Sequence, residues 1–421
     1  MSVAASRLRP ISRLAIFAFC VVSVVVSSRQ ALWYLSHDPA VSDFRIFMTG
    51  VDMVRSGQGR NLYSFEAQQR AQEHLYPSTR VSGLLPFNHL AFELLYYWPV
   101  SWLPYRAAIV AWAFVNVVFV LLIGWLLAPY TQALRHVTGV PIALLLLAFF
   151  PVIYALGEGQ DSLLFFLLLV LSLRSMDAGF PALAGFVLAL ACFKFHLALL
   201  IAFFVVVLAG KWRGLAGLAA GGVLVGGISL VMVGPGLVPS YLAMLRDQGV
   251  RLPWGFISWY MPNLRGFLQW GLGSWLDVGL ILPIIFVASA VVGVVASWLV
   301  LRGHAHQDLS MTYSLAILTT ILIGYHLHMQ DLAMAALPML VLLDRTIRER
   351  TQTERGSAIA LHLSPAWTAA LILAVASLYF FRIAAEAFPM LLTRGCLLAV
   401  PVLLLWIVSL RVYMTKPIVV L

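Results

Sequence analysis

Long apolar runs constrain this chain more than any other feature of its sequence. The runs at 14–35, 107–127, 215–233 and 278–301 approach the roughly 20 residues that a helix needs to cross the hydrocarbon core of a bilayer. Backbone amides in lipid must be paired inside a helix or a closed barrel, and the alternating pattern of a barrel is missing, so the runs predict helices. Of all residues 62% are hydrophobic and 10% are charged, against about 25% charged in soluble domains. We therefore expect an all-α membrane protein.

About 12 membrane spans fit the apolar pattern, and several are too short for a full crossing. They are predicted at 14–35, 106–127, 140–156, 161–176, 180–194, 196–210, 214–234, 278–301, 311–328, 332–344, 366–388 and 395–413. The proline-rich aromatic segment 84–105 predicts an interfacial or re-entrant element instead. We expect residues 1–421 to form one integral membrane domain.

The basic residues predict the orientation of the chain. Before the first span lie three arginines without an acid, and further basic residues fall in loops on the same side (Arg7, Arg9, Arg13, Lys211, Arg213, Arg345, Arg348, Arg350 and Arg355). The positive-inside rule then places both termini in the cytoplasm and the large loops 37–105 and 235–277 outside an inner (plasma) membrane. The net charge of +10 is explained by this asymmetry, so we expect no nucleic-acid partner.

Several classes of protein lack support in the sequence. Cys20, Cys192 and Cys396 all lie in apolar runs, which indicates packing and neither a disulfide framework nor a CxxC metal site. The chain contains no GxxxxGK[ST], GxSxG or HExxH motif, so a nucleotide-driven pump or a motif-recognisable hydrolase is unsupported.

Asp43 opens the polar stretch 42–63, a few residues beyond the first span. Phe44, Phe47, Met48 and Val51 recur at helical spacing after it, which predicts an amphipathic helix lying on the membrane interface. A carboxylate at this place can reach a substrate held at the headgroups. A solvated charge or a helix cap explains the same residue.

The segment 324–332, GYHLHMQDL, interrupts two apolar runs with His326, His328 and Asp331. Ionisable residues at membrane depth are costly and therefore indicate function. Three roles stay open: a zinc site, phosphate contact or proton handling, and interhelical hydrogen bonding. The i,i+2 spacing of the histidines points them to different faces of a helix, which disfavours zinc.

Three further places combine polar residues with a predicted outer turn. Lys194, in FKFH, either pairs with a lipid phosphate or extends to the headgroups. Glu158, Gln160 and Asp161, in LGEGQD, either bind a sugar or serve a tight turn. Arg265 lies in the aromatic-rich loop 235–277, where a sugar-diphosphate surface and a membrane-interface belt predict similar composition.

Taken in order, these motifs resemble the GT-C superfamily, and within it glycosyltransferase family 87, the polyprenol-phosphate-dependent membrane mannosyltransferases. The resemblance covers positions 40–340 and rests on SDF at 42–44, Gly50, LY at 62–63, the aromatic-proline segment, GQ at 159–160, Lys194 and HLHMQDL at 326–332. The acids Glu158 and Asp161 beside the GQ turn depart from the family pattern.

The resemblance implies a GT-C fold and an inverting glycosyltransferase. Its donor would be a polyprenyl-phosphate sugar, mannose or another hexose or pentose, and its acceptor a hydroxyl of a lipid or cell-envelope glycan. Asp43 would be the catalytic base, and Lys194, His326 and His328 would contact the donor phosphate. Beyond the resemblance, we expect Glu158, Gln160, Arg265 and Asp331 to contact substrate. Neither a metal ligand nor a cofactor is implied.

A secondary transporter or a flippase for lipid-linked sugars is the alternative, because many spans with polar residues inside them suit transport as well. Transporters often pair broken helices around a site at the middle of the membrane. Here the polar motifs gather at one predicted surface, which favours surface chemistry.

Overall fold

The computed structural model describes residues 10–36, 42–77, 84–251, 258–302, 308–354 and 363–414. Every regular element in those ranges is helical, and none is a strand, so the expected all-α architecture is confirmed. Arg7, Arg9 and Arg355, on which the predicted orientation partly depends, lie outside the described residues.

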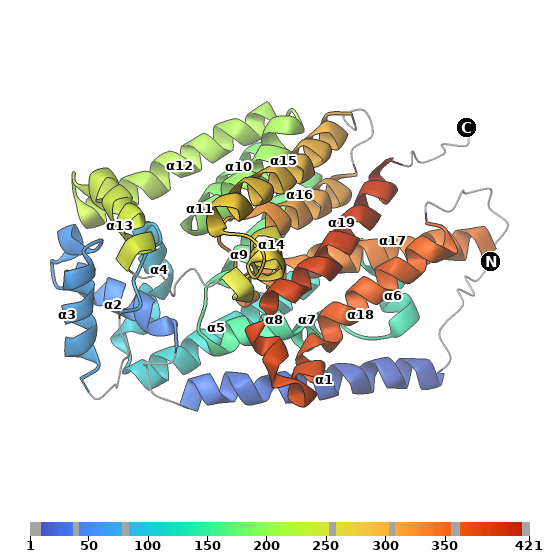
Figure 1. The fold of residues 1–421 in the computed structure, drawn as a ribbon, viewed down its shortest axis with the longest axis horizontal. Coiled ribbons are helices and arrows are strands. Elements are labelled where there is room, and N and C mark those ends of the chain that lie inside the picture. Colours follow the sequence, from blue (N-terminus) through green and yellow to red (C-terminus); the bar gives the residue numbers. More distant parts are fainter. Residues whose placement is uncertain are drawn as a thin grey trace.

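Six described helices are long and apolar enough to cross a membrane. They coincide with six of the predicted spans: α1 (Pro10–Ser36), α5 (Tyr105–Leu126), α12 (Trp212–Val233), α15 (Val278–Arg302), α18 (Pro365–Ala387), and α19 (Ala399–Met414) with the turn Gly395–Leu398 before it. In Figure 1 these helices run lengthwise through the molecule, with the start of α1 and the end of α19 toward the right.

A broken helix supplies a seventh span if its two parts are counted together. α10 (Pro181–Leu190) is followed by the 3₁₀ turn Cys192–Lys194, α11 (Phe195–Ala202) and a π-helical turn (Phe203–Leu208). The two parts of this pair are bent by 65°. The sequence predicted two separate spans here, at 180–194 and 196–210, and the bend places Lys194 at the break.

The remaining predicted spans correspond to helices that are too short or too charged to count as spans. α9 (Ser162–Asp177) has 16 residues and α16 (Leu309–Ile323) has 15, and most of their side chains are buried. α17 (Ala336–Glu354) is charged toward its end, and α7 (Ile142–Ala148) and α8 (Phe150–Gly157) split at Phe149. Pro151 lacks the N–H that a continuous helix would need there. By length and composition six described helices, or up to seven, can span a membrane, fewer than the sequence predicted.

Close helix packing in the bundle depends on glycine at the contact between α10 and α12. A Cβ atom built on Gly185 would lie 1.8 Å from the carbonyl oxygen of Gly214, and one on Gly217 would lie 1.8 Å from that of Ala182. Small residues of this kind let helix backbones approach in membrane proteins, where van der Waals contact replaces the hydrophobic effect.

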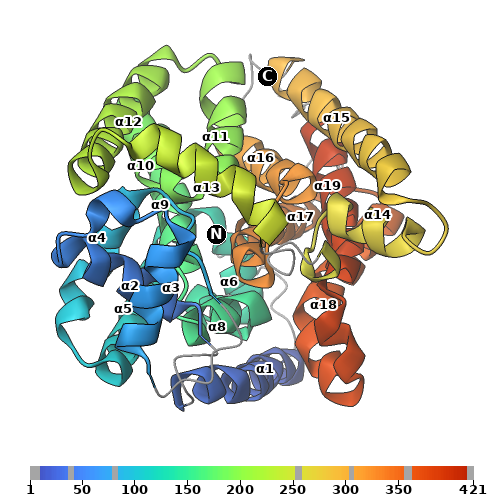
Figure 2. The ribbon, with the colours of Figure 1, turned by 60° about the vertical axis from the view of Figure 1, so that its left-hand side comes forward.

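Shorter helices gather at the end of the bundle opposite the start of α1. They are α2 (Phe44–Arg55), α3 (Phe65–Leu75), α4 (Leu94–Tyr97) and α13 (Leu237–Arg251), at the left in Figure 1. Figure 2 brings this end forward, with α3 and α13 in front and α14 (Leu264–Leu272) to one side. α6 (Gln132–Thr138) lies at the right in Figure 1, toward the start of α1. The predicted outer loops therefore share one end of the bundle.

The amphipathic helix expected after Asp43 is α2, but its apolar face packs against protein. Phe44 and Val51 are fully buried, and the ring of Phe47 stacks on Tyr97 with centroids 4.2 Å apart. These side chains belong to a second hydrophobic cluster, built from the first outer loop and the start of α5. The periodicity that predicted a face on the membrane interface is satisfied inside the molecule, which fixes the position of Asp43.

Candidate functional site

Asp43 lies at the N-terminus of α2 and does not cap that helix with its side chain. Its Oδ2 accepts a hydrogen bond from the Gln160 Nε2 amide at 2.5 Å. The two residues are far apart in sequence, so this contact joins the first outer loop to the turn before α9. The helix-cap explanation of Asp43 is therefore wrong.

Gly159 allows the segment around Asp43 to lie against the 158–161 turn. Its φ of +68° is in the left-handed region, and a Cβ there would lie 2.8 Å from the Cβ of Phe44. Ser42 Oγ donates to the carbonyl of Glu158 at 3.0 Å. The 158–161 turn thus packs against the residues before and after Asp43, and this packing directs Gln160 toward the Asp43 carboxylate.

Aromatic donors hold the other side of the same turn. The Tyr97 hydroxyl donates to the carbonyl of Gly159 at 3.3 Å, and the Trp112 Nε1 donates to the carbonyl of Gln160 at 3.3 Å. Both rings are buried. Because buried carbonyls need partners, these bonds stabilise the turn in the conformation that presents Gln160.

Lys194 is paired inside the protein. Its Nζ lies 2.8 Å from Asp161 Oδ1 and donates to Asp331 Oδ1 at 2.6 Å and to Ser162 Oγ at 3.1 Å. Lys194 is only 5% exposed, which excludes the alternative that its side chain extends to the headgroups. Its ammonium joins the broken helix to two acids from other elements.

The segment 324–328 is not helical, so the expectation that its two histidines face apart is wrong. The rings of His326 and His328 lie perpendicular with centroids 4.4 Å apart. The carbonyl of His326 lies 2.9 Å from His196 Nε2. The backbone N–H of His328 donates to Asp331 Oδ2 at 3.0 Å, which fixes Asp331 for its contact with Lys194.

Arg265 brings the second outer loop to the histidine segment. Its guanidinium stacks over the ring of Tyr325, 4.2 Å from the centroid, and donates to the Tyr325 carbonyl at 3.0 Å. Asn263 Nδ2 donates to the carbonyl of Gly324 at 2.8 Å. Arg265 therefore contacts the residue that precedes His326 in the sequence.

The electrostatics of the site favour a basic carboxylate at Asp43. Burial raises the pKa of Asp43, and His328, Gln160 and Arg45 only partly offset this. Burial and the nearby Asp43 raise the pKa of Glu158 to about 8, so Glu158 is mostly protonated at neutral pH. A desolvated carboxylate with a raised pKa is a better proton acceptor than an ordinary aspartate.

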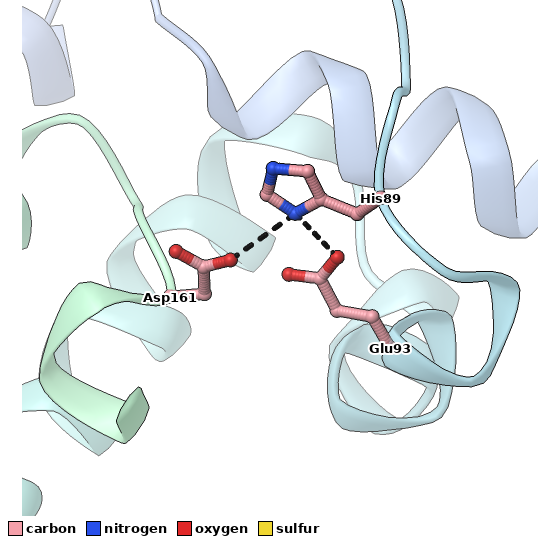
Figure 3. Close-up of side chains that lie close together, drawn as sticks. All are labelled: His89, Glu93 and Asp161. Atoms are coloured by element: carbon pink, nitrogen blue, oxygen red, sulfur yellow. Dashed lines mark hydrogen bonds and ion pairs between the residues drawn. The ribbon is translucent and has the colours of Figure 1, made fainter. Parts of the chain in front are cut away.

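Sequence reasoning missed three residues of this region. Arg45 is 2% exposed and lies close enough to Asp43 to lower its pKa. His89 Nδ1 lies 2.6 Å from Glu93 Oε2 and 3.3 Å from Asp161 Oδ2 (Figure 3). The i,i+4 spacing of His89 and Glu93 in an apolar, proline-rich segment was the available signal. Among the described residues, His89, Glu93 and Asp161 form a group that could hold a metal ion.

The model of glycosyltransferase family 87 matches residues 91–324, more than half of the 421 residues. The chain belongs to glycosyltransferase family 87. No curated protein and no solved structure matches it.

Family 87 membership makes the protein a membrane glycosyltransferase and not the transporter or flippase that the spans alone allowed. Glu158, Gln160, Lys194 and Arg265 lie inside the matched region. Asp43, His326, His328 and Asp331 lie outside it and join the site through the contacts described above. One connected set of contacts thus includes polar residues from both outer loops, the 158–161 turn and the break in the α10–α11 helix.

Proposed function

We propose that this family 87 protein is an inverting glycosyltransferase that uses Asp43 as its general base. The donor is a polyprenyl-phosphate sugar, mannose or another hexose or pentose, and the acceptor is a hydroxyl of a lipid or cell-envelope glycan. The observation that carries the proposal is the Asp43 carboxylate, which is held by Gln160 Nε2 at 2.5 Å and not by its own helix. A carboxylate fixed by one neutral donor keeps lone pairs for a proton.

The reaction is a single displacement. An oxygen of the Asp43 carboxylate takes the proton of the acceptor hydroxyl as that hydroxyl oxygen attacks the anomeric carbon. The bond between this carbon and the phosphate oxygen breaks, and its electron pair leaves with the polyprenyl phosphate. Because one displacement occurs without an enzyme nucleophile, the anomeric configuration inverts.

Donors near the leaving phosphate stabilise the charge that develops on it. We assign the contact with the leaving phosphate to His326, His328 and Arg265. Arg265 stacks on Tyr325, the residue before His326, and the imidazoles of His326 and His328 lie perpendicular to each other. Lys194 is assigned to this contact as well, but it holds Asp161 and Asp331. Direct contact of Lys194 with phosphate therefore requires that it exchange one carboxylate for the donor.

Substitution of Asp43 by Asn tests the proposal. Purified protein is incubated with a panel of radiolabelled polyprenyl-phosphate sugars and host lipid extract, and product formation is measured. A general base contributes about 10²–10⁴-fold, so Asp43→Asn should lose at least a hundredfold in rate while eluting as folded protein in detergent. The matched control is Asp52→Asn, on the same helix α2. A wild-type rate in Asp43→Asn would remove the base from the mechanism.

The extracytoplasmic placement of the site is proposed from the orientation of the basic loops and is tested separately. Gln58 and Ala178 are both exposed and lie at opposite ends of the bundle, next to α2 and after α9. In intact cells a membrane-impermeant thiol reagent should label Gln58→Cys and should label Ala178→Cys only after lysis. The reverse pattern would place Asp43 on the cytoplasmic side.

A further inference from the structure

We propose that His89, Glu93 and Asp161 bind one divalent transition-metal ion of the Zn²⁺ or Mn²⁺ type. The three side chains come from two separate parts of the chain, and one nitrogen of His89 faces oxygens of both acids (Figure 3). The inference concerns a site beside the transfer site and does not depend on the proposed transfer reaction.

The ligand atoms are close enough to surround an ion. His89 Nδ1, a Glu93 oxygen and an Asp161 oxygen all lie within 4.8 Å of one another. Metal bonds of about 2.0–2.2 Å put tetrahedral ligand atoms roughly 3.3–3.6 Å apart. The separation of Nδ1 from Asp161 Oδ2 is 3.3 Å, whereas its separation from Glu93 Oε2 is 2.6 Å. A small rotation of the Glu93 side chain away from His89 would widen the shorter separation enough for the ion to fit between the two groups.

Acidic groups outnumber basic ones in this region. The contacts join three carboxyl groups, of Glu93, Asp161 and Asp331, to the ammonium of Lys194 and the imidazole of His89. A buried cluster with an excess of acids favours a cation as its ligand.

A second observation is independent of the ligand distances. The Oε1 atom of Glu93 is buried and has no hydrogen-bond partner among the described residues, and its carboxyl group is aimed at Asp161 and His89. Buried carboxylate oxygens without a partner are rare. Coordination of the ion through either or both oxygens of Glu93 satisfies the group.

The surroundings match those of a metal centre. Asp161 uses Oδ2 toward His89 and Oδ1 toward Lys194, so the ammonium is the outer partner that orients a ligating carboxylate. Both acids are fully buried, while the His89 side chain is 24% exposed and offers a path of entry. One imidazole with two carboxylates suits Zn²⁺ and Mn²⁺, since imidazole favours the former and oxygen ligands the latter. The ion would fasten the first outer loop to the turn that carries Gln160.

Metal binding is measured on the full chain, purified in detergent through a tag without histidines and treated with a chelator. Mn²⁺ is titrated with detection of the free ion by electron paramagnetic resonance, and Zn²⁺ is then tested as its competitor. The wild type should bind one equivalent. His89→Gln and Glu93→Gln should bind Mn²⁺ more than about a hundredfold more weakly, beyond the loss typical of outer-shell changes. The controls His74→Gln and Glu73→Gln alter exposed residues of α3 and should bind as the wild type does.

The melting temperature in detergent is a second measurement of metal binding, and it tests the proposal even if one of the variants folds poorly. Added Mn²⁺ or Zn²⁺ should raise it for the chelated wild type and both controls, because an ion that binds only the folded state stabilises that state. The proposal is overturned if the wild type binds neither ion at millimolar concentration, or if His89→Gln binds as tightly as the wild type. Loss of metal binding with transfer intact would leave the mechanism at Asp43 standing.

Discussion

The hydrogen bond from Gln160 to Asp43 predicts how the pH dependence of transfer changes when it is removed. The substitution Gln160→Met keeps a side chain of similar length and deletes the Nε2 donor. This donor lies 2.5 Å from Asp43 Oδ2 and stabilises the ionised form of the carboxyl. Its removal therefore raises the pKa of Asp43 further above its usual range.

The size of the shift follows from the strength of the bond. A hydrogen bond to a charged group contributes about 1.5–3 kcal/mol, and one pKa unit corresponds to about 1.4 kcal/mol. A general base works only when ionised, so activity is lost as the pH falls through its pKa. The acid limb of kcat/KM, which reports on the free enzyme, should thus move upward by roughly one to two pH units in Gln160→Met.

Initial rates of transfer from the active polyprenyl-phosphate sugar are measured between pH 5 and 9. They give the acid limb of the kcat/KM profile and the height of its plateau. Gln58→Met, at an exposed position after α2, is the matched control and should leave the limb in place. A fall in the plateau alone would indicate that Gln160 contacts only substrate. An acid limb that stays in place, or moves to lower pH, would refute the reasoning that Gln160 sets the basicity of Asp43.

Three other changes have defined outcomes. Gly159→Ala should lower the free energy of unfolding by about 1–3 kcal/mol, because alanine is strained in a left-handed conformation, and it should also lower the transfer rate, because the new Cβ displaces Phe44. The control Gly179→Ala, with φ of +81° and nothing within 4 Å of its Cβ, has the backbone strain alone. Equal transfer rates in the two variants would contradict this prediction. Lys194→Met leaves two buried acids without their cation and should lower the free energy of unfolding by about 3–5 kcal/mol, measured by denaturation in mixed detergent; an unchanged stability would show that the acids are protonated. Gly217→Val should separate α10 from α12 and lower the melting temperature of the protein, whereas Gly222→Val, on the same helix with open space around it, should not.

The membrane class was open to prediction because it depends on local properties of the sequence. Length and hydropathy identify α1, α5, α12, α15, α18 and α19 as spans. Alternation of spans then puts the ends that carry Asp43, Gln160, Lys194 and Asp331 on one side. That these ends join one set of contacts agrees with the expectation.

The sequence predicts more spans than the six or seven that the lengths of the described helices support, because several apolar runs are divided into short helices. α9 and α16 are apolar but have only 16 and 15 residues, fewer than a full crossing needs. The partners of polar residues were equally hidden. Lys194 pairs with Asp331, which is 137 positions away, and neither spacing nor composition carries that information. The His89–Glu93 pair had a local signal in its i,i+4 spacing, but Asp161 completes the group only in three dimensions.

Three aspartates converge on this site, and their partners separate the proton acceptor from the fixed anions. Burial acts to raise the pKa of each aspartate. For Asp161 and Asp331 the Lys194 ammonium outweighs burial, so their pKa values lie below the usual range. Asp43 has an amide as its hydrogen-bond donor and keeps a raised pKa. Groups whose surroundings push their pKa values apart take different roles in a mechanism. In the proposed mechanism Asp161 and Asp331 stay charged and position Lys194, whereas Asp43 is the one of the three aspartates whose raised pKa suits the acceptance of a proton.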